Sequence, residues 1–274
     1  MSYFKVLFFR GLNTYATDNV RVGPIDLGPA HAQLQQSFRD HGVELIPILE
    51  FGFGSLEDQV QRAISYSLKN NLIHENDSIH LLGHSTGGLV ARGFAQHHPL
   101  CKNIMSISTL ATPHHGSQSA LKALEVLNKS AIKKRFYKKL GYDLSTRVAS
   151  FTALTPHSVE LFNQQNQIPD HITKACITFS IDKSQLSGFL KLGHFFLKSM
   201  SPQGEENDGL VELSTQRWGK HLGHYKLDHF GQLGINLYLK DFKKQLFGES
   251  FDQMVEDLVE FWSNQRPIKN KKAA

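Results

Sequence analysis

The central stretch of the chain reads Ser78-Ile79-His80-Leu81-Leu82-Gly83-His84-Ser85-Thr86-Gly87-Gly88-Leu89-Val90-Ala91-Arg92. Its first half is a short apolar run that favours a β-strand, and its second half is typical of a helix start. Between them lies the pattern Gly83-x-Ser85-x-Gly87. A strand can enter a helix through so tight a bend only where small residues leave room for the neighbouring backbone. The bend exposes the Ser85 hydroxyl above the first helical N–H groups, so the stretch predicts a nucleophile beside donors for a developing oxyanion.

Length and composition fit one α/β domain. The 274 residues, of which 40% are hydrophobic, are enough to bury a large core. The balance of 30 Lys and Arg against 25 Asp and Glu gives a net charge of +5. This charge permits attraction to anionic surfaces, but no recognisable nucleic-acid motif accompanies it, so no nucleic-acid partner is expected. Cys101 and Cys176 lack metal-ligand spacing and indicate buried thiols in a reducing compartment, with a single disulfide as the alternative.

The N-terminal apolar run predicts a core strand. It extends from Tyr3 to Phe9, ends at Arg10 and lacks a small-residue cleavage site, so it does not resemble a signal peptide. No apolar stretch approaches 18 uninterrupted residues, and no membrane-spanning segment is expected. We therefore predict a cytoplasmic location, with export by a leaderless route or from a truncated precursor left open.

Strand and helix patterns alternate along most of the chain. We predict strands over residues 3–9, 43–48, 79–82, 103–110, 175–181 and 224–227, and helices over about 29–40, 55–72, 87–97, 233–246 and 251–263. This alternation predicts an α/β fold with a mostly parallel, doubly wound sheet. Active sites in such sheets lie beyond the carboxyl ends of the strands. The loops after Phe9, Gly83 and Leu110 should therefore face one crevice.

Between Ser117 and about Gln167 the pattern changes to helix upon helix and predicts an inserted helical cap. The expected organisation is a single domain over residues 1–265, with the cap at about 117–167 and a basic tail over 266–274. Within the cap, residues 119–140 combine an apolar stripe at helical spacing with seven basic residues and one acid, Glu125. Such a segment predicts a mobile helix that contacts anionic lipid surfaces. The alternative is an ordinary helix packed by its stripe.

A serine hydroxyl becomes nucleophilic near neutral pH when an adjacent imidazole takes its proton, and a carboxylate must fix the tautomer of that imidazole. On strand-to-helix bends of this kind the chain order is serine, acid, histidine. Asp208 and His229 fit that order, each in a loop expected after one of the last two strands. Asp182 is the main rival for the acid, and His221 and His224 are rivals for the base.

Three blocks of the sequence together resemble bacterial triacylglycerol lipases of the true-lipase type, which have the α/β-hydrolase fold. The blocks are residues 83–92, 112–117 and 207–211, and with Trp218-Gly219 and Asp228-His229 they cover roughly residues 3–240 in the same order. The resemblance implies Ser85 as nucleophile, Asp208 as acid and His229 as base. It also implies an oxyanion hole formed by the backbone N–H groups of Leu12 and Thr86.

Two positions depart from the family pattern. Arg10 replaces the histidine that usually precedes the glycine of the first oxyanion loop, a change that keeps the backbone donor. Gly231 stands where many of these lipases have a calcium-binding aspartate, so we expect no calcium, and no other metal or cofactor. His114 and His115 are interpreted as supporting residues and not as catalytic ones.

Together these features predict a serine hydrolase of carboxylic esters that acts on acyl lipids through a Ser-His-Asp triad and an acyl-enzyme intermediate. The expected partners are a lipid or ester substrate and an anionic lipid surface, and no oligomeric state is predicted. One alternative is a thioesterase or acyltransferase with the same triad. A non-catalytic lipid-binding module on the same fold is the other alternative, and an intact triad argues against it.

Overall fold

A parallel sheet forms the centre of the computed structural model, which describes residues 4–11, 19–22, 25–29, 31–49, 53–129, 144–186, 205–235 and 241–265. Its strands are β1 (Phe4–Phe9), β4 (Val43–Pro47), β5 (Ile79–His84), β6 (Ile104–Leu110), β7 (Thr173–Phe179) and β8 (Lys220–Tyr225). They lie in the order β4-β1-β5-β6-β7-β8, and each of these neighbouring pairs is parallel. The predicted α/β fold with a parallel sheet is confirmed, and the loops after β1, β5 and β6 leave the sheet at the same edge.

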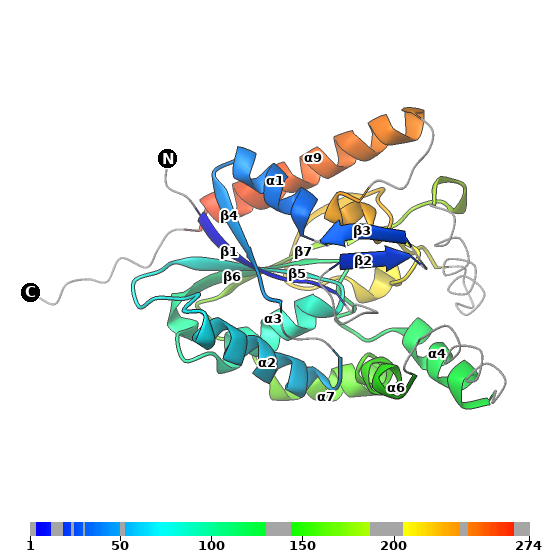
Figure 1. Cartoon of the computed structure of the whole chain (residues 1–274), viewed down its shortest axis with the longest axis horizontal. Helices are drawn as coiled ribbons and strands as arrows, with labels where there is room; N and C mark the ends of the chain where they lie inside the picture. The colour runs from blue at the N-terminus through cyan, green and yellow to red at the C-terminus, as the bar shows by residue number, and fades with distance from the viewer. Residues whose placement is uncertain are drawn as a thin grey trace, which may run out of the picture.

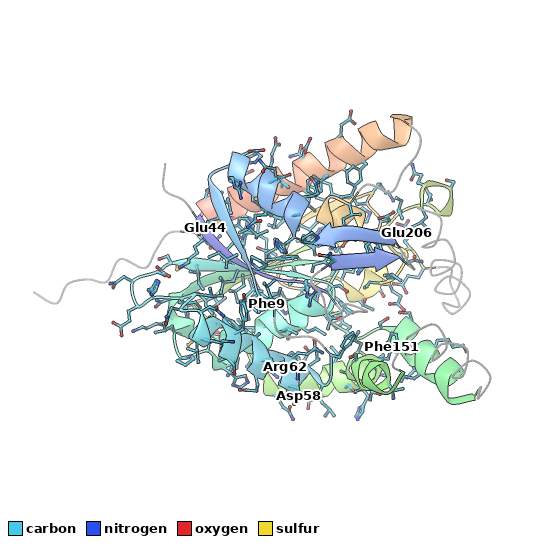
Figure 2. The ribbon with its side chains drawn as sticks, in the orientation of Figure 1. Phe9, Glu44, Asp58, Arg62, Phe151 and Glu206 are labelled. Carbon is cyan, nitrogen blue, oxygen red and sulfur yellow. The ribbon has the colours of Figure 1, made fainter. Side chains whose placement is uncertain are left out.

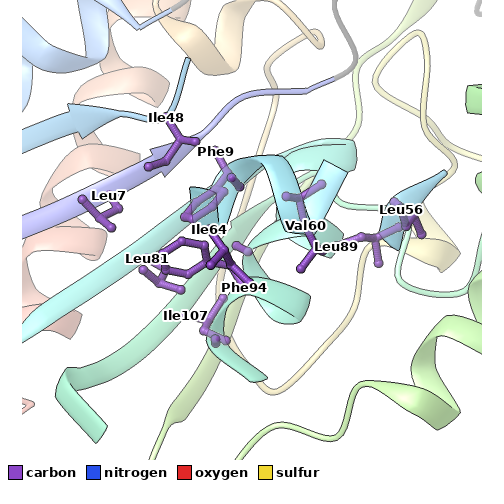
Figure 3. Packing of buried hydrophobic residues seen from close by; sticks show 14 of the residues in the cluster. Leu7, Phe9, Ile48, Leu56, Val60, Ile64, Leu81, Leu89, Phe94 and Ile107 are labelled. Atoms are coloured by element: carbon purple, nitrogen blue, oxygen red, sulfur yellow. The ribbon is translucent and has the colours of Figure 1, made fainter. Parts of the chain in front are cut away.

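Helices cover both faces of the sheet because the side chains of each strand point alternately to either side (Figure 1). In β1, Leu7 and Phe9 pack in one core with α2 (Leu56–Lys69) and α3 (Thr86–His97), the core drawn in Figure 3. Val6 and Phe8 pack in the other core with α1 (Ala32–Asp40) and α9 (Asp241–Ser263). The sheet is therefore doubly wound, as predicted.

Helix α2 illustrates how a sequence pattern produces this layer. Ser55 caps its N-terminus, since the Ser55 side chain accepts a hydrogen bond from the Asp58 N–H at 3.1 Å. Val60 faces the core, whereas Asp58 and Arg62 lie on the exposed side of the helix (Figure 2). Figure 2 also shows Phe9 in the interior of the molecule. The apolar stripe thus determines which side of α2 meets the sheet.

Trp262 connects α9 to the sheet through a hydrogen bond and a ring contact. Its ring is fully buried, and its indole N–H donates a hydrogen bond to the Ser108 hydroxyl of β6 at 3.0 Å. The ring also stacks on His80 of β5, with 6.0 Å between centroids, and His80 Nδ1 lies 2.8 Å from the Ser106 hydroxyl. Because the buried indole N–H has a partner, this packing leaves no unsatisfied donor on the tryptophan.

The predicted cap insertion contains helices α4 (Gln118–Lys129), α6 (Leu144–Ala153) and α7 (Pro156–Gln165), between β6 and β7. Helix α7 packs on the first core through Val159 and Phe162. The cationic cluster of the 119–140 segment lies at positions 133–139, outside the described residues. Its expected contact with lipid surfaces therefore stays a prediction.

The N-terminal part of the predicted helix over residues 29–40 is wrong. Strands β2 (Asn19–Val22) and β3 (Ile25–Pro29) form an antiparallel hairpin, in which Pro29 pairs with Asn19. Helix α1 starts later, at Ala32. Proline lacks the N–H that a helix interior or a central strand uses, and here it occupies the end of a short two-stranded sheet.

The C-terminal elements also differ from the prediction. One helix, α9, replaces the two helices expected on either side of Gly248. Glycine weakens a helix by about 1 kcal/mol, but the stacked rings of Phe247 and Phe251 pack on the second core from both sides of it. Leu233, the predicted helix start, lies instead in a 3-10 turn, η4 (Gly231–Leu233). The last strand is Lys220–Tyr225, whereas residues 224–227 were predicted. Across the described part of the chain, no helix has the length and apolar character needed to cross a bilayer.

Candidate active site

Ser85 occupies the predicted bend between β5 and α3. Its backbone dihedrals, φ 55° and ψ −132°, lie in a region that residues with a side chain rarely adopt. Two backbone hydrogen bonds hold this conformation: Ser85 N donates to Leu110 O at 2.8 Å, and Gly88 N donates to Ser85 O at 3.1 Å. Such strain persists only where the surrounding structure enforces it, and it is common at functional sites.

The glycines around Ser85 are required by close backbone packing. A Cβ atom at Gly83 would lie 2.3 Å from Gly88 Cα, and one at Gly87 would lie 2.1 Å from Phe9 O. The structure adds Gly88, where a Cβ would lie 2.0 Å from Thr112 Oγ1, and Gly11, where it would lie 2.8 Å from Ser85 Cβ. The loop after β1 and the loop after β6 therefore both pack against the bend that contains Ser85.

Backbone donors lie next to the serine. Thr86 is the first residue of the 12-residue helix α3, and its N–H makes no hydrogen bond with the part of the chain that the structure describes. A free N–H at a helix N-terminus carries partial positive charge and can bind an oxyanion. Leu12, the second expected donor, lies outside the described residues, but its neighbour Gly11 contacts the serine.

Asp208 and His229 form a buried pair. Asp208 Oδ2 lies 2.8 Å from His229 Nδ1, and the backbone N–H of His229 donates to Asp208 O at 3.0 Å. The other carboxylate oxygen accepts the N–H groups of Leu210 and Val211 at 3.0 and 2.8 Å. Because an ionised carboxylate only accepts hydrogen bonds, His229 carries its proton on Nδ1 and leaves Nε2 as the basic nitrogen.

The surroundings of Asp208 keep it ionised at neutral pH. Burial by itself would raise the pKa of its carboxyl group. The charge of His229 and hydrogen bonds from His229, Gln232 and Leu210 outweigh that effect, and the pKa of Asp208 is lowered below its ordinary value. The pair thus has the electrostatic arrangement that orients an imidazole and stabilises its protonated form.

Two residues that sequence reasoning missed, His84 and Gln232, connect the serine strand to this pair. His84 Nε2 lies 3.1 Å from both His229 O and Gln232 Oε1, and Gln232 Nε2 donates to Asp208 Oδ2 at 2.7 Å. The rings of His84 and His229 have centroids 4.6 Å apart. Burial, with a smaller contribution from His229, lowers the pKa of His84 to about 3, so His84 stays neutral.

The three expected triad residues therefore lie in one cluster, since His84 adjoins Ser85 and contacts His229. No hydrogen bond joins the Ser85 hydroxyl to His229, two residues that are both within the described ranges. Nucleophile and base often form this bond only when substrate binds.

The rival residues lie elsewhere. Asp182 is exposed, and its carboxylate makes no hydrogen bond with any described residue. His221 and His224 both contact the Thr178 hydroxyl, at 2.9 and 3.0 Å, and not Asp208. The carboxylate that contacts His229 is that of Asp208.

His114 is a buried supporting residue. Its Nδ1 accepts a hydrogen bond from Arg92 Nη1 at 3.2 Å, and its Nε2 donates to the Thr109 hydroxyl at 3.0 Å. Its ring stacks on Trp218, which also lies under the Arg92 guanidinium. Burial, followed by the charges of Arg92 and His115, lowers the pKa of His114 well below its ordinary value. This neutral imidazole joins α3, β6 and the loop before β8, whereas His115 is exposed.

The parallel sheet and the serine bend have the arrangement of the α/β-hydrolase fold, and solved structures share that fold. A metagenomic carboxyl esterase superposes with a TM-score of 0.65 at 15% identity, covering 94% of this chain and 76% of the esterase. A Staphylococcus hyicus lipase gives 0.65 at 14% identity, covering 94% and 95%. The mature form of a Bacillus licheniformis lipase gives 0.61 at 21% identity, covering 88% and 91%.

Sequence comparisons point to the same group of hydrolases. A model of the palmitoyl protein thioesterase family matches residues 47–171. Triacylglycerol lipase 2 of Saccharomyces cerevisiae is 27% identical over 225 residues, which cover 73% of this chain and 62% of the yeast protein. The chain thus spans less than two thirds of the length of that relative. By fold and by sequence it resembles lipases and esterases.

Proposed function

We propose that the chain is a serine hydrolase of carboxylic esters, with acyl lipids as its substrate class. The observation that carries the proposal is the buried Asp208–His229 pair at 2.8 Å, joined through His84 to the strained bend at Ser85. This arrangement supplies a nucleophile, a base and an orienting carboxylate. The names of the yeast lipase and of the bacterial lipases support the substrate class.

In the first half of the reaction Ser85 Oγ attacks the carbonyl carbon of the ester while its proton passes to His229 Nε2. The carbonyl electron pair moves onto oxygen, and the resulting oxyanion accepts hydrogen bonds from the backbone N–H groups of Thr86 and Leu12. Asp208 stabilises the imidazolium. The bond between carbon and the alcohol oxygen then breaks, His229 gives its proton to that oxygen, and an acyl-enzyme remains.

In the second half a water molecule attacks the acyl carbon. His229 Nε2 takes a proton from the water as the new carbon–oxygen bond forms. The bond to Ser85 Oγ then breaks, the proton returns from His229 to the serine oxygen, and the carboxylic acid leaves. The ester and water are the two reactants, and Ser85 and His229 end in the protonation states in which they began.

Apolar side chains at the helical insertion support an acyl substrate. Leu121 of α4 and Leu210 of the acid loop are exposed, and the Ser119 hydroxyl donates to Leu210 O at 3.3 Å. The start of α4 therefore contacts the loop that carries Asp208. Apolar side chains exposed in this region suit an acyl chain or a lipid surface, and we include contact of residues 119–140 with anionic lipid in the proposal.

A fluorophosphonate probe and a p-nitrophenyl ester test the proposed chemistry. We expect the probe to label Ser85, and Ser85→Ala to lose labelling and to lower kcat by about 10⁴-fold or more. His224→Ala, which changes a rival histidine outside the site, serves as the control and should keep most activity. An unlabelled and inactive wild-type chain would instead support the non-catalytic lipid-binding module.

A thioesterase is the second candidate, because the matching family model is that of palmitoyl protein thioesterase. The same residues would cleave a thioester through the same acyl-enzyme. Comparing kcat/KM for an oxygen ester and a thioester with an identical acyl chain separates the two. A clear preference for the thioester would favour the second candidate, and transfer of the acyl group to an added alcohol would indicate an acyltransferase.

A further inference from the structure

Gln232 bridges the residues of the candidate site. It lies in the η4 turn, three residues after His229, and is fully buried. Its side-chain amide lies between Asp208 and His84, with hydrogen bonds of 2.7 and 3.1 Å. Since His84 Nε2 also contacts the His229 carbonyl oxygen at 3.1 Å, the four residues form a closed ring of contacts.

The direction of each hydrogen bond in this ring follows from Asp208. A carboxylate only accepts, so the amide nitrogen of Gln232 faces Asp208 and its carbonyl oxygen faces His84. His84 must then carry its proton on Nε2, which donates to two carbonyl oxygens. Its Nδ1 is left bare, has no hydrogen-bond partner in the described structure, and would lie 3.3 Å from a Cβ at Gly11. One orientation therefore satisfies every hydrogen bond within the ring.

We infer that Gln232 is a positioning residue for the triad, which holds Asp208 in the orientation that His229 uses and joins this pair to the strand ending at Ser85. The inference rests on the proposed function. Asp208 Oδ2 receives both Gln232 Nε2 and His229 Nδ1, whereas Oδ1 receives two backbone N–H groups. With four donors in place, rotation of the carboxylate would break at least one bond to a buried group.

Gln232 also stabilises the negative charge of Asp208, the charge that stabilises the imidazolium of His229. The Gln232 N–H donates to Asp208 Oδ2, the same oxygen that His229 contacts. Removing this hydrogen bond leaves more negative charge on that oxygen, so the attraction between Asp208 and protonated His229 becomes stronger. Among the described residues, Asp208 and His84 are titratable groups in contact with His229. Nearby Asp228 turns the chain by accepting the N–H groups of Phe230 and Gly231 at 3.2 and 2.8 Å. Without Gln232, the activity should therefore change its dependence on pH.

Two substitutions and a matched control test this role. Gln232→Met removes both hydrogen bonds and keeps an unbranched side chain. Gln232→Glu keeps the shape, and in its protonated form it can still donate to Asp208 and accept from His84. The control is Gln216→Met, because Gln216 is also fully buried but its side chain bonds, within the described residues, to backbone atoms of Phe179 and Val211.

For both Gln232 variants we expect kcat on a soluble p-nitrophenyl ester to fall by roughly tenfold to a hundredfold, with KM changed by less than about twofold. The acidic limb of the kcat/KM profile should move to higher pH by about half a unit or more, and further in Gln232→Glu, because an ionised Glu adds a second negative charge. In proton NMR, the deshielded proton between His229 and Asp208 should shift. Gln216→Met should move neither readout.

An unchanged pH limb and an unchanged proton signal in both Gln232 variants, with losses no larger than in Gln216→Met, would overturn the inference. Failure of the proposed function has a different signature, since the wild-type chain would then neither hydrolyse the ester nor react with the fluorophosphonate probe. The proton signal still measures in that case whether Gln232 positions Asp208 against His229. If Gln232→Met does not fold, the ionised form of Gln232→Glu, which cannot donate to Asp208, supplies the same readouts.

Discussion

The Asp208 carboxylate is buried completely, yet it accepts four hydrogen bonds, from Leu210, Val211, His229 and Gln232. Burying a charge is costly unless neighbouring groups stabilise it. Here each of the two carboxylate oxygens accepts two hydrogen bonds. A chain that needed Asp208 only for packing would gain more from an apolar side chain of similar volume. A buried carboxylate at this position fits an orienting role toward His229.

Asp208→Asn should lower kcat by roughly 10⁴-fold, because the amide can present an N–H to His229 and favour the wrong imidazole tautomer. The measurement is turnover of a soluble p-nitrophenyl ester. Asp182→Asn is the matched control, since Asp182 is exposed and was the rival acid in the sequence. If instead Asp182→Asn were the damaging change, the assignment of the acid would be wrong.

At the residue scale, the motif indicated Ser85 because its chemistry depends on residue type. Chain order left Asp182 beside Asp208 for the acid, and the resemblance to lipases was needed to prefer Asp208, with His229 as the base. His84 and Gln232 could not be recognised in the same way. A buried amide acts through the atoms that it faces, and the sequence separation of 148 residues between His84 and Gln232 hides that contact. Only the folded chain shows that His84 and Gln232 belong to one network.

The strand-to-helix bend is the element on which the site depends. Gly87→Ala would place a Cβ 2.1 Å from the carbonyl oxygen of Phe9, and backbone cannot move away cheaply. We expect it to lower the free energy of unfolding by about 3 kcal/mol or more, measured by urea denaturation, and to abolish ester hydrolysis.

Gly248→Ala is the control for that substitution. Gly248 lies inside α9, and a Cβ there would have no atom within 4 Å apart from its neighbours in the helix backbone. Alanine is a better helix former than glycine, so this variant should be more stable than the wild-type chain by about 1 kcal/mol. If both substitutions lowered the free energy of unfolding by the same amount, close packing at the bend could not be the reason that Gly87→Ala destabilises the chain.

At the element scale, periodic apolar patterns predicted the strands and helices that build the sheet, because burial on two faces leaves a clear signal in the sequence. The β2–β3 hairpin was missed since its strands are short and belong to a separate two-stranded sheet. Helix α9 was divided wrongly because a glycine that breaks an isolated helix is tolerated when apolar residues on both sides pack on a core.

The whole molecule should respond to acid through its buried histidines. Burial lowers the pKa of His80 to about 4, whereas an exposed histidine in the unfolded chain titrates near 6.5. Between these values the unfolded chain binds more protons than the folded one. Stability therefore falls as the pH falls through this window, by up to about 1.4 kcal/mol per pH unit for one such group, and is unaffected by His80 above it.

His80→Gln tests that response, because glutamine can still hydrogen-bond to Ser106 but does not titrate. We expect the dependence of the free energy of unfolding on pH to be shallower in the variant between pH 4 and 6.5, as followed by urea denaturation at a series of pH values. The absolute stability at neutral pH is a separate quantity and can be lower. An identical slope in both proteins would show that His80 does not contribute to acid sensitivity.

The contact of Trp262 with β5 and β6 has a consequence for biosynthesis. Val6 and Phe8 are synthesised about 250 residues before Trp262, although α9 packs on their side of the sheet. Until Trp262 has been synthesised, this face of the sheet lacks the cover of α9 and exposes apolar side chains, a surface that chaperones bind and that promotes aggregation. The emergence of Trp262 from the ribosome therefore sets the earliest moment at which this core can close.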